Sequence, residues 1–361
     1  GVLAVAGDDH VAKSSTAAHQ SDHIFKACGL PVFFPASVQD ILDQGLHAIA
    51  MSRFAGVWAG MKTIQEIVES SATAHIDPER VQIVLPEFVM PPGGVHIRWP
   101  DTALEQEARL FDYKWYAALA YIRANKLNHN VIEGPNDRFG LIASGKAYND
   151  TRQALLDLGL DDATCQRLGI RLHKVNVVWP LEAYTTREFA TGLQEILVIE
   201  EKRQMIEYQL KEQLYNWRED VRPRVIGKFD EKGEWTLPEG NWLLPACGEL
   251  TPAMIARVIA NRIGRYFTSL VIRDRLAFLD QKDQQLQQPR EVIPRVPYYC
   301  SGCPHNTGTK LPDGSMALAG IGCHYMATWI YPSTKTYTQM GGEGVPWIGI
   351  APFTDTPHIF A

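Results

Sequence analysis

Short apolar segments alternate with helical segments along most of the chain, and this alternation constrains the fold more than any other feature. In the first series, Ser37 is well placed to cap a helix that extends to about Arg53. The series is predicted to contain strands at Val2–Ala6, Pro31–Phe34 and Val57–Met61 and a short helix at Ser21–Cys28. Strands and helices in this order predict a parallel sheet covered by helices.

A second series of the same kind begins near Arg138. Its predicted strands are Phe139–Ala143, Arg171–Val178 and Ile196–Glu200, and its predicted helices are Asp150–Leu158, Thr186–Gln194 and Met205–Trp217. Each strand is a short apolar run, as expected when helices cover both faces of a sheet. Outside this series we expect a long helix at Ala103–Lys126, helical structure at Thr251–Leu279 and an exposed linker at Gln281–Glu291. The fold class is therefore α/β, with several domains that each hold a mainly parallel sheet.

Composition narrows the class of protein. A length of 361 residues suggests two or three domains, and a net charge of -6 argues against a general nucleic-acid-binding protein. No apolar run approaches the roughly 20 residues that cross a membrane. The first residues lack the basic start of a signal peptide. Three of the six cysteines, Cys28, Cys165 and Cys247, are scattered along the chain, which favours a reducing, cytoplasmic setting over a disulfide framework. Both ends of the chain read as interrupted, so we expect an internal piece of a longer polypeptide.

Three cysteines lie on two glycine-rich turns. Cys300 and Cys303 form a C-x-x-C motif around Gly302, and Cys323 follows in a second turn. Three thiolates in this arrangement indicate part of a metal or iron–sulfur site, which normally has a fourth ligand. With His305 and His324 nearby, the spacing fits zinc as well as an iron–sulfur cluster. Free structural thiols are a third alternative.

Three further motifs each have an ordinary structural interpretation. The run Gly140–Ala147 is close to a phosphate-binding loop, but Ala147 replaces the Ser or Thr that binds magnesium, and the run is apolar enough to be a strand. We expect a strand, a turn at Gly145 and a helix that starts at Asn149 or Asp150. The polar loops Asp8–His10 and Glu200–Arg203 follow predicted strands. Structural or interface roles are the preferred interpretation for both loops, although ligands bind at this edge of parallel sheets.

Several longer motifs resemble one family. The runs CSGCPHN (300–306), GIGCHYMA (320–327) and QMGGEGVPWIG (339–349) resemble the thiamine-diphosphate-binding domain of 2-oxoacid:ferredoxin oxidoreductases. The resemblance is closest to the long fused bacterial form of indolepyruvate ferredoxin oxidoreductase. Residues 7–23 resemble the end of its pyrimidine-binding domain, and residues 140–155, 177–182 and 198–212 resemble its transketolase C-terminal-like domain.

This resemblance implies several thiamine-diphosphate-enzyme-like domains. Their order is the C-terminal part of a pyrimidine-binding-like domain (1–75), a linker and long helix (76–135), a transketolase C-terminal-like domain (136–230), a helical connector (231–290) and the start of a diphosphate-binding domain (291–361). The implied reaction is oxidative decarboxylation of an aryl 2-oxoacid, most specifically indolepyruvate, with coenzyme A and ferredoxin. Its products are an acyl-CoA, carbon dioxide and reduced ferredoxin. The implied assembly is a cytoplasmic homo-oligomer that binds neither nucleic acid nor membrane.

The family's cofactors are thiamine diphosphate, magnesium and a [4Fe–4S] cluster. The resemblance assigns Cys300, Cys303 and Cys323 to the cluster, and His305, Gly320, Gly322 and Cys323 to the surroundings of the thiamine cofactor. It also places the fourth cluster ligand and the magnesium-binding loop beyond Ala361, and the activating glutamate before Gly1. The chain by itself is therefore expected to bind thiamine diphosphate poorly and to be inactive. The alternatives are an enzyme for another 2-oxoacid and a non-catalytic scaffold with structural zinc.

Overall fold

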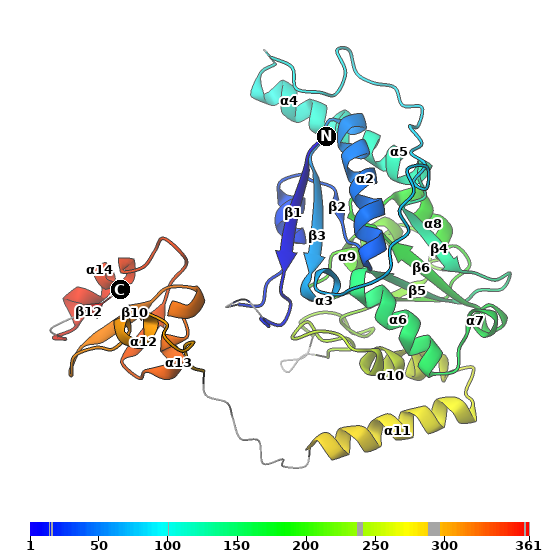
Figure 1. Cartoon of the computed structure of the whole chain (residues 1–361). Helices are drawn as coiled ribbons and strands as arrows, with labels where there is room; N and C mark the ends of the chain where they lie inside the picture. Colours follow the sequence, from blue (N-terminus) through cyan, green and yellow to red (C-terminus); the bar gives the residue numbers. More distant parts are fainter. Residues whose placement is uncertain are drawn as a thin grey trace. The chain divides into compact units, whose positions relative to one another are not determined.

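The chain forms two compact units, Gly1–Gln285 and Leu286–Ala361, which are described separately (Figure 1). The computed structural model describes all residues except 14, 16, 100, 237–240, 288–296, 357, 358 and 361, and it leaves out the side chains of 287, 359 and 360. Among the described residues, no helix combines the length and the apolar character that crossing a membrane requires.

The larger unit contains two sheets, and its first sheet has the order β1-β3-β2-β7. Its strands are β1 (Leu3–Asp8), β3 (Ala59–Ile64), β2 (Val32–Phe33) and β7 (Val177–Trp179). The first three are mutually parallel, and β7 is antiparallel to β2. The accompanying helices are α1 (Asp22–Ala27), α2 (Val38–Ala55) and α3 (Gln65–Val68). Ser37 caps α2 as predicted, because its side chain accepts a hydrogen bond from the Asp40 backbone N–H.

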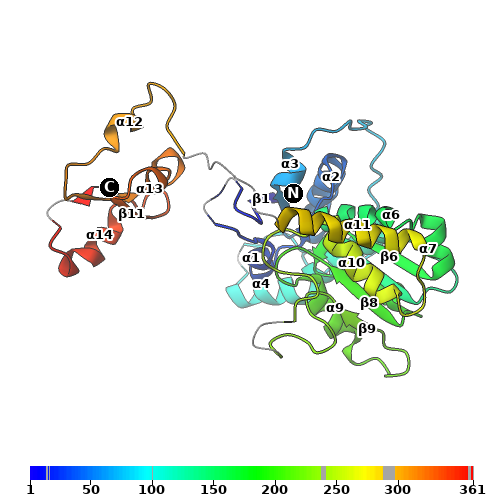
Figure 2. The same ribbon diagram turned by 90° about the horizontal axis from the view of Figure 1, so that it is seen from below.

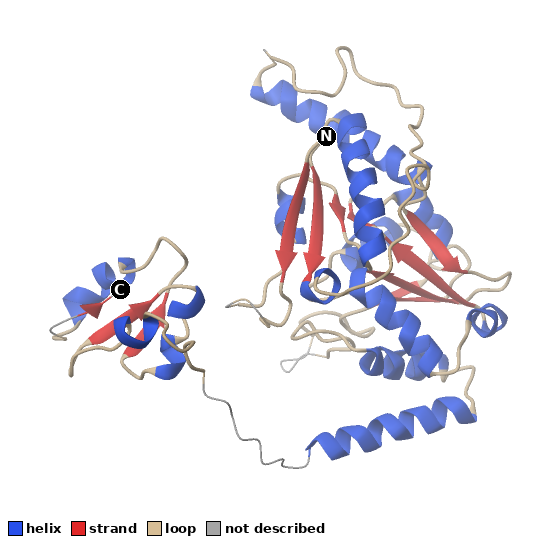
Figure 3. Cartoon of the chain, viewed as in Figure 1, coloured by secondary structure: helices blue, strands red, loops and turns tan. Residues whose placement is uncertain are grey.

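The second sheet has the order β4-β6-β5-β8-β9, and only β4 runs antiparallel to its neighbour. Its strands are β4 (Asn128–Ile132), β6 (Ile170–Val175), β5 (Phe139–Ser144), β8 (Glu195–Ile199) and β9 (Arg224–Ile226). Its helices are α6 (Gly145–Asp157), α7 (Asp162–Leu168), α8 (Ala183–Ala190), α9 (Ile206–Tyr215), α10 (Pro252–Ile263) and α11 (Leu270–Gln287). The predicted α/β class with mainly parallel sheets is confirmed, and Figure 3 shows the strands between helices.

Both faces of this second sheet are buried. Leu141 and Leu197 face one apolar cluster, shared with α6, α10 and α11, which lie close together in Figure 2. Ile142 and Val198 face another cluster, which also contains residues of the first sheet such as Val32. A third cluster packs α2 and α5 (Trp115–Ala124) against β2 and β3. Neighbouring residues of β5 and β8 face different clusters because successive side chains of a strand point to opposite faces of the sheet.

The predicted strand Arg171–Val178 is wrong in one respect, because it is two strands in two different sheets. β6 ends at Val175 and β7 begins at Val177. Asn128 holds the break between them, since its side-chain oxygen accepts hydrogen bonds from the backbone N–H groups of Asn176 and Val177, each at 3.0 Å. This contact links residues far apart in the sequence, so no local pattern indicates it.

Three predicted helix boundaries also differ from the structure. Helix α6 begins at Gly145 rather than at Asn149 or Asp150, because the chain turns into a helix as soon as β5 ends. The predicted helix Thr251–Leu279 is interrupted between α10 and α11. Residues 281–287 of the predicted linker continue α11, with exposed side chains through Leu286, while 288–291 lie outside the described residues.

The long predicted helix is continuous, although it contains one wider turn. It consists of α4 (Ala103–Arg109), a π-helical turn η1 (Leu110–Lys114) and α5.

The smaller unit contains a parallel sheet of order β11-β10-β12. Its strands are β10 (Met316–Ala319), β11 (Thr334–Tyr337) and β12 (Ile359–Phe360). Its helical segments are α12 (His305–Gly308), η2 (Gly322–His324), α13 (Ala327–Ile330), α14 (Val345–Ile350) and η3 (Ala351–Phe353). The three cysteines of the sequence motif all belong to this unit.

Candidate functional site

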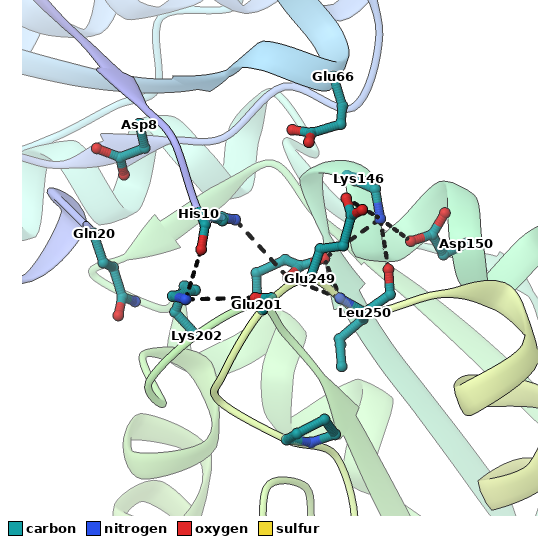
Figure 4. A network of polar contacts seen from close by, with 12 residues as sticks. Asp8, His10, Gln20, Glu66, Lys146, Asp150, Glu201, Lys202, Glu249 and Leu250 are labelled. Atoms are coloured by element: carbon teal, nitrogen blue, oxygen red, sulfur yellow. Dashed lines mark hydrogen bonds and ion pairs between the residues drawn. The ribbon is translucent and has the colours of Figure 1, made fainter. Parts of the chain in front are cut away.

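The two polar loops that the sequence places far apart meet at the carboxyl ends of β1 and β8 (Figure 4). Lys202 Nζ donates a hydrogen bond to the backbone oxygen of His10 at 2.7 Å. Gln20 and Arg203 exchange two hydrogen bonds, each at 3.0 Å, between the Gln20 amide group and the Arg203 backbone. His10 and Gln20 after β1 therefore form one polar network with Lys202 and Arg203 after β8, at the edge where parallel sheets place ligands.

A buried histidine and a buried carboxyl group lie at the centre of this network. His10 Nδ1 is 3.9 Å from Glu201 Oε2, and both side chains are almost inaccessible to solvent. Burial, helped by the charges of Lys62 and Lys202, lowers the pKa of His10 to about 2. His10 is therefore neutral near pH 7, and its contact with Glu201 is not an ion pair. Burial also raises the pKa of Glu201.

Lys146, the residue that would bind phosphate in a phosphate-binding loop, is used within this network. Its Nζ donates to Asp150 Oδ2 at 2.6 Å and to the Leu250 backbone oxygen at 2.7 Å. The preceding glycine-flanked run is β5 itself, and Gly145 has a φ of +52° and lies against Phe34. The interpretation of this run as a strand is confirmed, but the predicted turn at Gly145 is wrong, because Gly145 is already the first residue of α6.

Glu200 caps the helix that follows it. Its carboxylate accepts hydrogen bonds from the backbone N–H groups of Met205 (2.9 Å), Ile206 (2.8 Å) and Glu207 (3.1 Å). Burial raises the pKa of Glu200 to about 7, against the effect of these three donors. These bonds satisfy N–H groups at the start of α9 that have no partner within the helix. The geometry thus supports the structural interpretation of this loop.

Two buried lysines were missed by the sequence analysis. Lys62 lies on β3, and its Nζ is 3.0 Å from Asp22 Oδ2 and 4.5 Å from the centre of the Phe34 ring. Lys228 donates to the Pro245 backbone oxygen at 3.0 Å, and burial lowers its pKa to about 8. For Lys62 the available signal was a single lysine within the otherwise uncharged run 54–65, whereas Lys228 has charged neighbours on both sides and gave no such signal.

In the smaller unit, the C-x-x-C motif forms a tight turn. The Cys303 backbone N–H donates to the Cys300 oxygen at 3.0 Å, and Gly302 has a φ of +74°. Asn306 Nδ2 donates to the same Cys300 oxygen at 2.9 Å. Cys303 Sγ lies 3.2 Å from His305 Nδ1, and the His305 ring stacks on Tyr299. The turn therefore holds Cys303 and His305 together.

Cys323 lies in the second glycine-rich turn, where the two glycines have different surroundings. A Cβ atom at Gly320 would lie 2.6 Å from the Glu343 carboxylate, whereas one at Gly322, with a φ of +75°, would meet no atom within 4 Å. The Gly320 N–H donates to His324 Nδ1 at 3.0 Å. Gly320 thus has a local packing reason to be glycine, and Gly322 leaves open space beside Cys323.

The three cysteines are available, but they do not form a complete metal site. Cys300 and Cys323 are exposed, Cys303 is partly buried, and none is in a disulfide. Within the part of the chain that the structure describes, no group of three or more His, Cys, Asp or Glu side chains is arranged to hold a metal ion. Cysteine thiolates are the usual ligands of iron–sulfur clusters, so the residue types fit a cluster. Within the described ranges, the positions of the three side chains do not form a binding site for one.

Comparison with known proteins connects the chain to one family. Residues 128–289 match the family model for the indolepyruvate ferredoxin oxidoreductase middle domain. The chain is 26% identical to indolepyruvate oxidoreductase subunit IorA of Pyrococcus abyssi, over 97% of the chain and 50% of that protein. It is 25% identical to the subunit of the same name from Methanothermobacter marburgensis, over 84% of the chain and 43% of that protein. The chain spans about half the length of these relatives.

Two solved structures show a more distant similarity. One is 2-oxoglutarate:ferredoxin oxidoreductase from Magnetococcus marinus, with a TM-score of 0.43 and 12% identity over 72% of this chain and 48% of that chain. The other is a split-gene transketolase in an inactive β4 tetramer, with a TM-score of 0.40 and 13% identity over 73% of this chain and 66% of that chain.

Proposed function

We propose that the chain belongs to the indolepyruvate ferredoxin oxidoreductase family and that the complete protein catalyses the oxidative decarboxylation of a 2-oxoacid. The proposed substrate is an aryl 2-oxoacid, with indolepyruvate first, and the products are an acyl-CoA, carbon dioxide and reduced ferredoxin. One observation carries this proposal: the middle-domain match lies inside a similarity to indolepyruvate oxidoreductase subunits that covers 97% of the chain.

The proposed cofactors are thiamine diphosphate, magnesium and a [4Fe–4S] cluster. Thiamine diphosphate supplies the electron sink for loss of carbon dioxide, and a cluster accepts electrons one at a time. We assign Cys300, Cys303 and Cys323 as cluster ligands. Their support is the thiolate chemistry, the C-x-x-C turn around Gly302 and the accessibility of the thiols.

The surroundings of the thiamine cofactor are proposed to include His305, Gly320, Gly322 and Cys323. The open space at Gly322 supports a close approach of a ligand to the backbone. His305 contacts Cys303 Sγ and stacks on Tyr299, so it also positions the C-x-x-C turn.

One observation favours a second candidate function. The 3.2 Å contact between Cys303 Sγ and His305 Nδ1 brings together the two side-chain types that structural zinc prefers. A non-catalytic scaffold with a structural zinc ion is therefore the competing proposal for the smaller unit.

The test compares cysteine variants of the complete protein purified without oxygen. We expect Cys300→Ser, Cys303→Ser and Cys323→Ser each to lose iron and acid-labile sulfide and to stop reducing ferredoxin, because serine does not replace a cluster thiolate. Cys28→Ser, at another exposed cysteine, is the control and should keep both properties. Stoichiometric zinc without iron in the unmodified protein would support the scaffold instead, and full ferredoxin reduction by all three variants would reject the ligand assignment.

A further inference from the structure

A second polar site lies at the amino ends of the parallel strands, whereas the network of Figure 4 follows their carboxyl ends. The first residues of three neighbouring strands, Phe139, Glu195 and Arg224, are aligned in register. A pocket of about 380 Å³ opens beside them. Its polar lining includes Arg138, Glu195, Arg224, Arg262, Arg265 and Tyr266.

Arginines outnumber carboxylates at this pocket. Glu195 Oε2 forms ion pairs with the guanidinium nitrogens of Arg262 (2.6 Å), Arg265 (3.2 Å) and Arg224 (3.7 Å). The same arginines also contact Glu231, with Arg265 at 3.1 Å and Arg224 at 3.2 Å. The hydrogen bond from Arg262 holds the pKa of Glu231 at about 2, so this carboxylate is charged at neutral pH.

Arg138 adds a further positive charge to the pocket. Within the described residues it has no ion pair, and its guanidinium lies 3.8 Å from the centre of the Tyr266 ring. The neighbouring Asp137 is already paired with Arg171 at 2.8 Å. Among the described residues, four guanidinium groups thus face two carboxylates, which gives this group of side chains a net charge of +2, and Arg138 is the one guanidinium of the four without an ion pair.

Several donors at the pocket remain available to a ligand. The Arg224 and Arg265 side chains are each about half exposed, at 53% and 51%. The Tyr266 hydroxyl is buried and does not open to solvent, so this residue contributes its ring, which lies against the Arg138 guanidinium, and not a donor.

We propose that this pocket binds a phosphoryl group, with Arg138 and the half-exposed Arg224 as its principal contacts. Guanidinium groups match the oxygens of phosphate with paired hydrogen bonds. A phosphoryl dianion would also balance the net charge of these side chains, whereas a single carboxylate would balance half of it. The phosphoryl group could belong to a free phosphate or to a nucleotide.

The test is calorimetric titration of the chain with inorganic phosphate, pyrophosphate and ADP at low ionic strength. We expect saturable binding, and a loss of affinity of about tenfold or more for Arg138→Gln and Arg224→Gln, because each change removes a charged donor. Arg218→Gln is the control, since this arginine is 77% exposed and also pairs with a carboxylate, that of Asp220. Tyr266→Phe keeps the ring that lies against Arg138 and removes only a buried hydroxyl, so it should bind the probes as the original chain does.

The outcomes separate the sources of the phosphoryl group. Equal affinity for pyrophosphate and ADP would show that the phosphoryl groups alone are recognised, and tighter binding of ADP would show that the nucleoside adds contacts. The proposal is overturned if no probe binds saturably, or if Arg218→Gln weakens binding as much as Arg138→Gln does. Because the readout is binding, its result is independent of any oxidoreductase activity.

Discussion

Three ionisable side chains are buried where the two polar loops of the larger unit meet. His10, Glu200 and Glu201 are all more than nine-tenths buried. Their pKa values move in the direction that burial dictates: that of His10 falls and those of the two carboxyl groups rise. A pKa that differs between the folded and unfolded states makes stability depend on pH.

His10→Gln should reduce the acid sensitivity of the larger unit. Since the folded pKa of His10, about 2, lies below its ordinary value of 6.5, protons bind the unfolded state preferentially between these two values. Stability from this residue is present above pH 6.5 and falls as the pH drops towards 2. Between pH 7 and pH 5, the original chain should lose about 2 kcal/mol more free energy of unfolding than the variant loses.

Urea unfolding at the two pH values measures this difference. His96→Gln, at an exposed histidine, is the matched control and should keep the original pH dependence. If His10→Gln and the original chain lose stability in parallel, His10 does not stay neutral in the folded protein.

At the scale of elements, the junction between β5 and α6 explains why the glycine-flanked run is not a phosphate-binding loop. The strand extends to Ser144 and the helix starts at Gly145, so no loop remains between them. The ring of Phe34, just after β2, occupies the space next to Gly145. The junction therefore serves to pack the two sheets of the larger unit together.

Gly145→Ala should destabilise the larger unit by about 2–4 kcal/mol, because it combines overpacking with a backbone conformation that disfavours alanine. A Cβ atom there would lie 2.4 Å from the Phe34 ring, and the φ of +52° is in the left-handed region. Gly192→Ala is the control, since its φ is +81° but a Cβ atom would meet nothing within 4 Å. Denaturant unfolding measures the loss of stability in each variant, and the difference between the two losses is the cost of the contact with Phe34. Equal losses would show that the junction has room for a Cβ atom.

At the scale of the whole molecule, the buried apolar clusters of the larger unit are internal to it. All three clusters consist of residues between Leu3 and Leu279. The smaller unit contains its own parallel sheet and all three motif cysteines. A unit that has its own apolar core is able to fold as a domain.

Residues 1–285, expressed without the rest of the chain, should therefore fold cooperatively. We expect a thermal midpoint within about 5 °C of the corresponding transition in the whole chain, because the apolar burial that stabilises this unit is retained. Circular dichroism and calorimetry measure both transitions. Loss of a cooperative transition in the shorter chain would show that residues 286–361 complete its core.

The sequence by itself determined the α/β class, most strand and helix positions, the cap at Ser37 and the pairing of Cys300 with Cys303 in one turn. These features depend on residues close together in the chain, where periodicity and turn chemistry act directly. Tertiary structure decided the rest. Asn128 divides the predicted strand Arg171–Val178 between two sheets, and Lys202 meets His10 across a separation of 192 residues. Such contacts depend on how sheets pack, because two segments that each look ordinary acquire a role only when the fold brings their side chains within hydrogen-bonding distance.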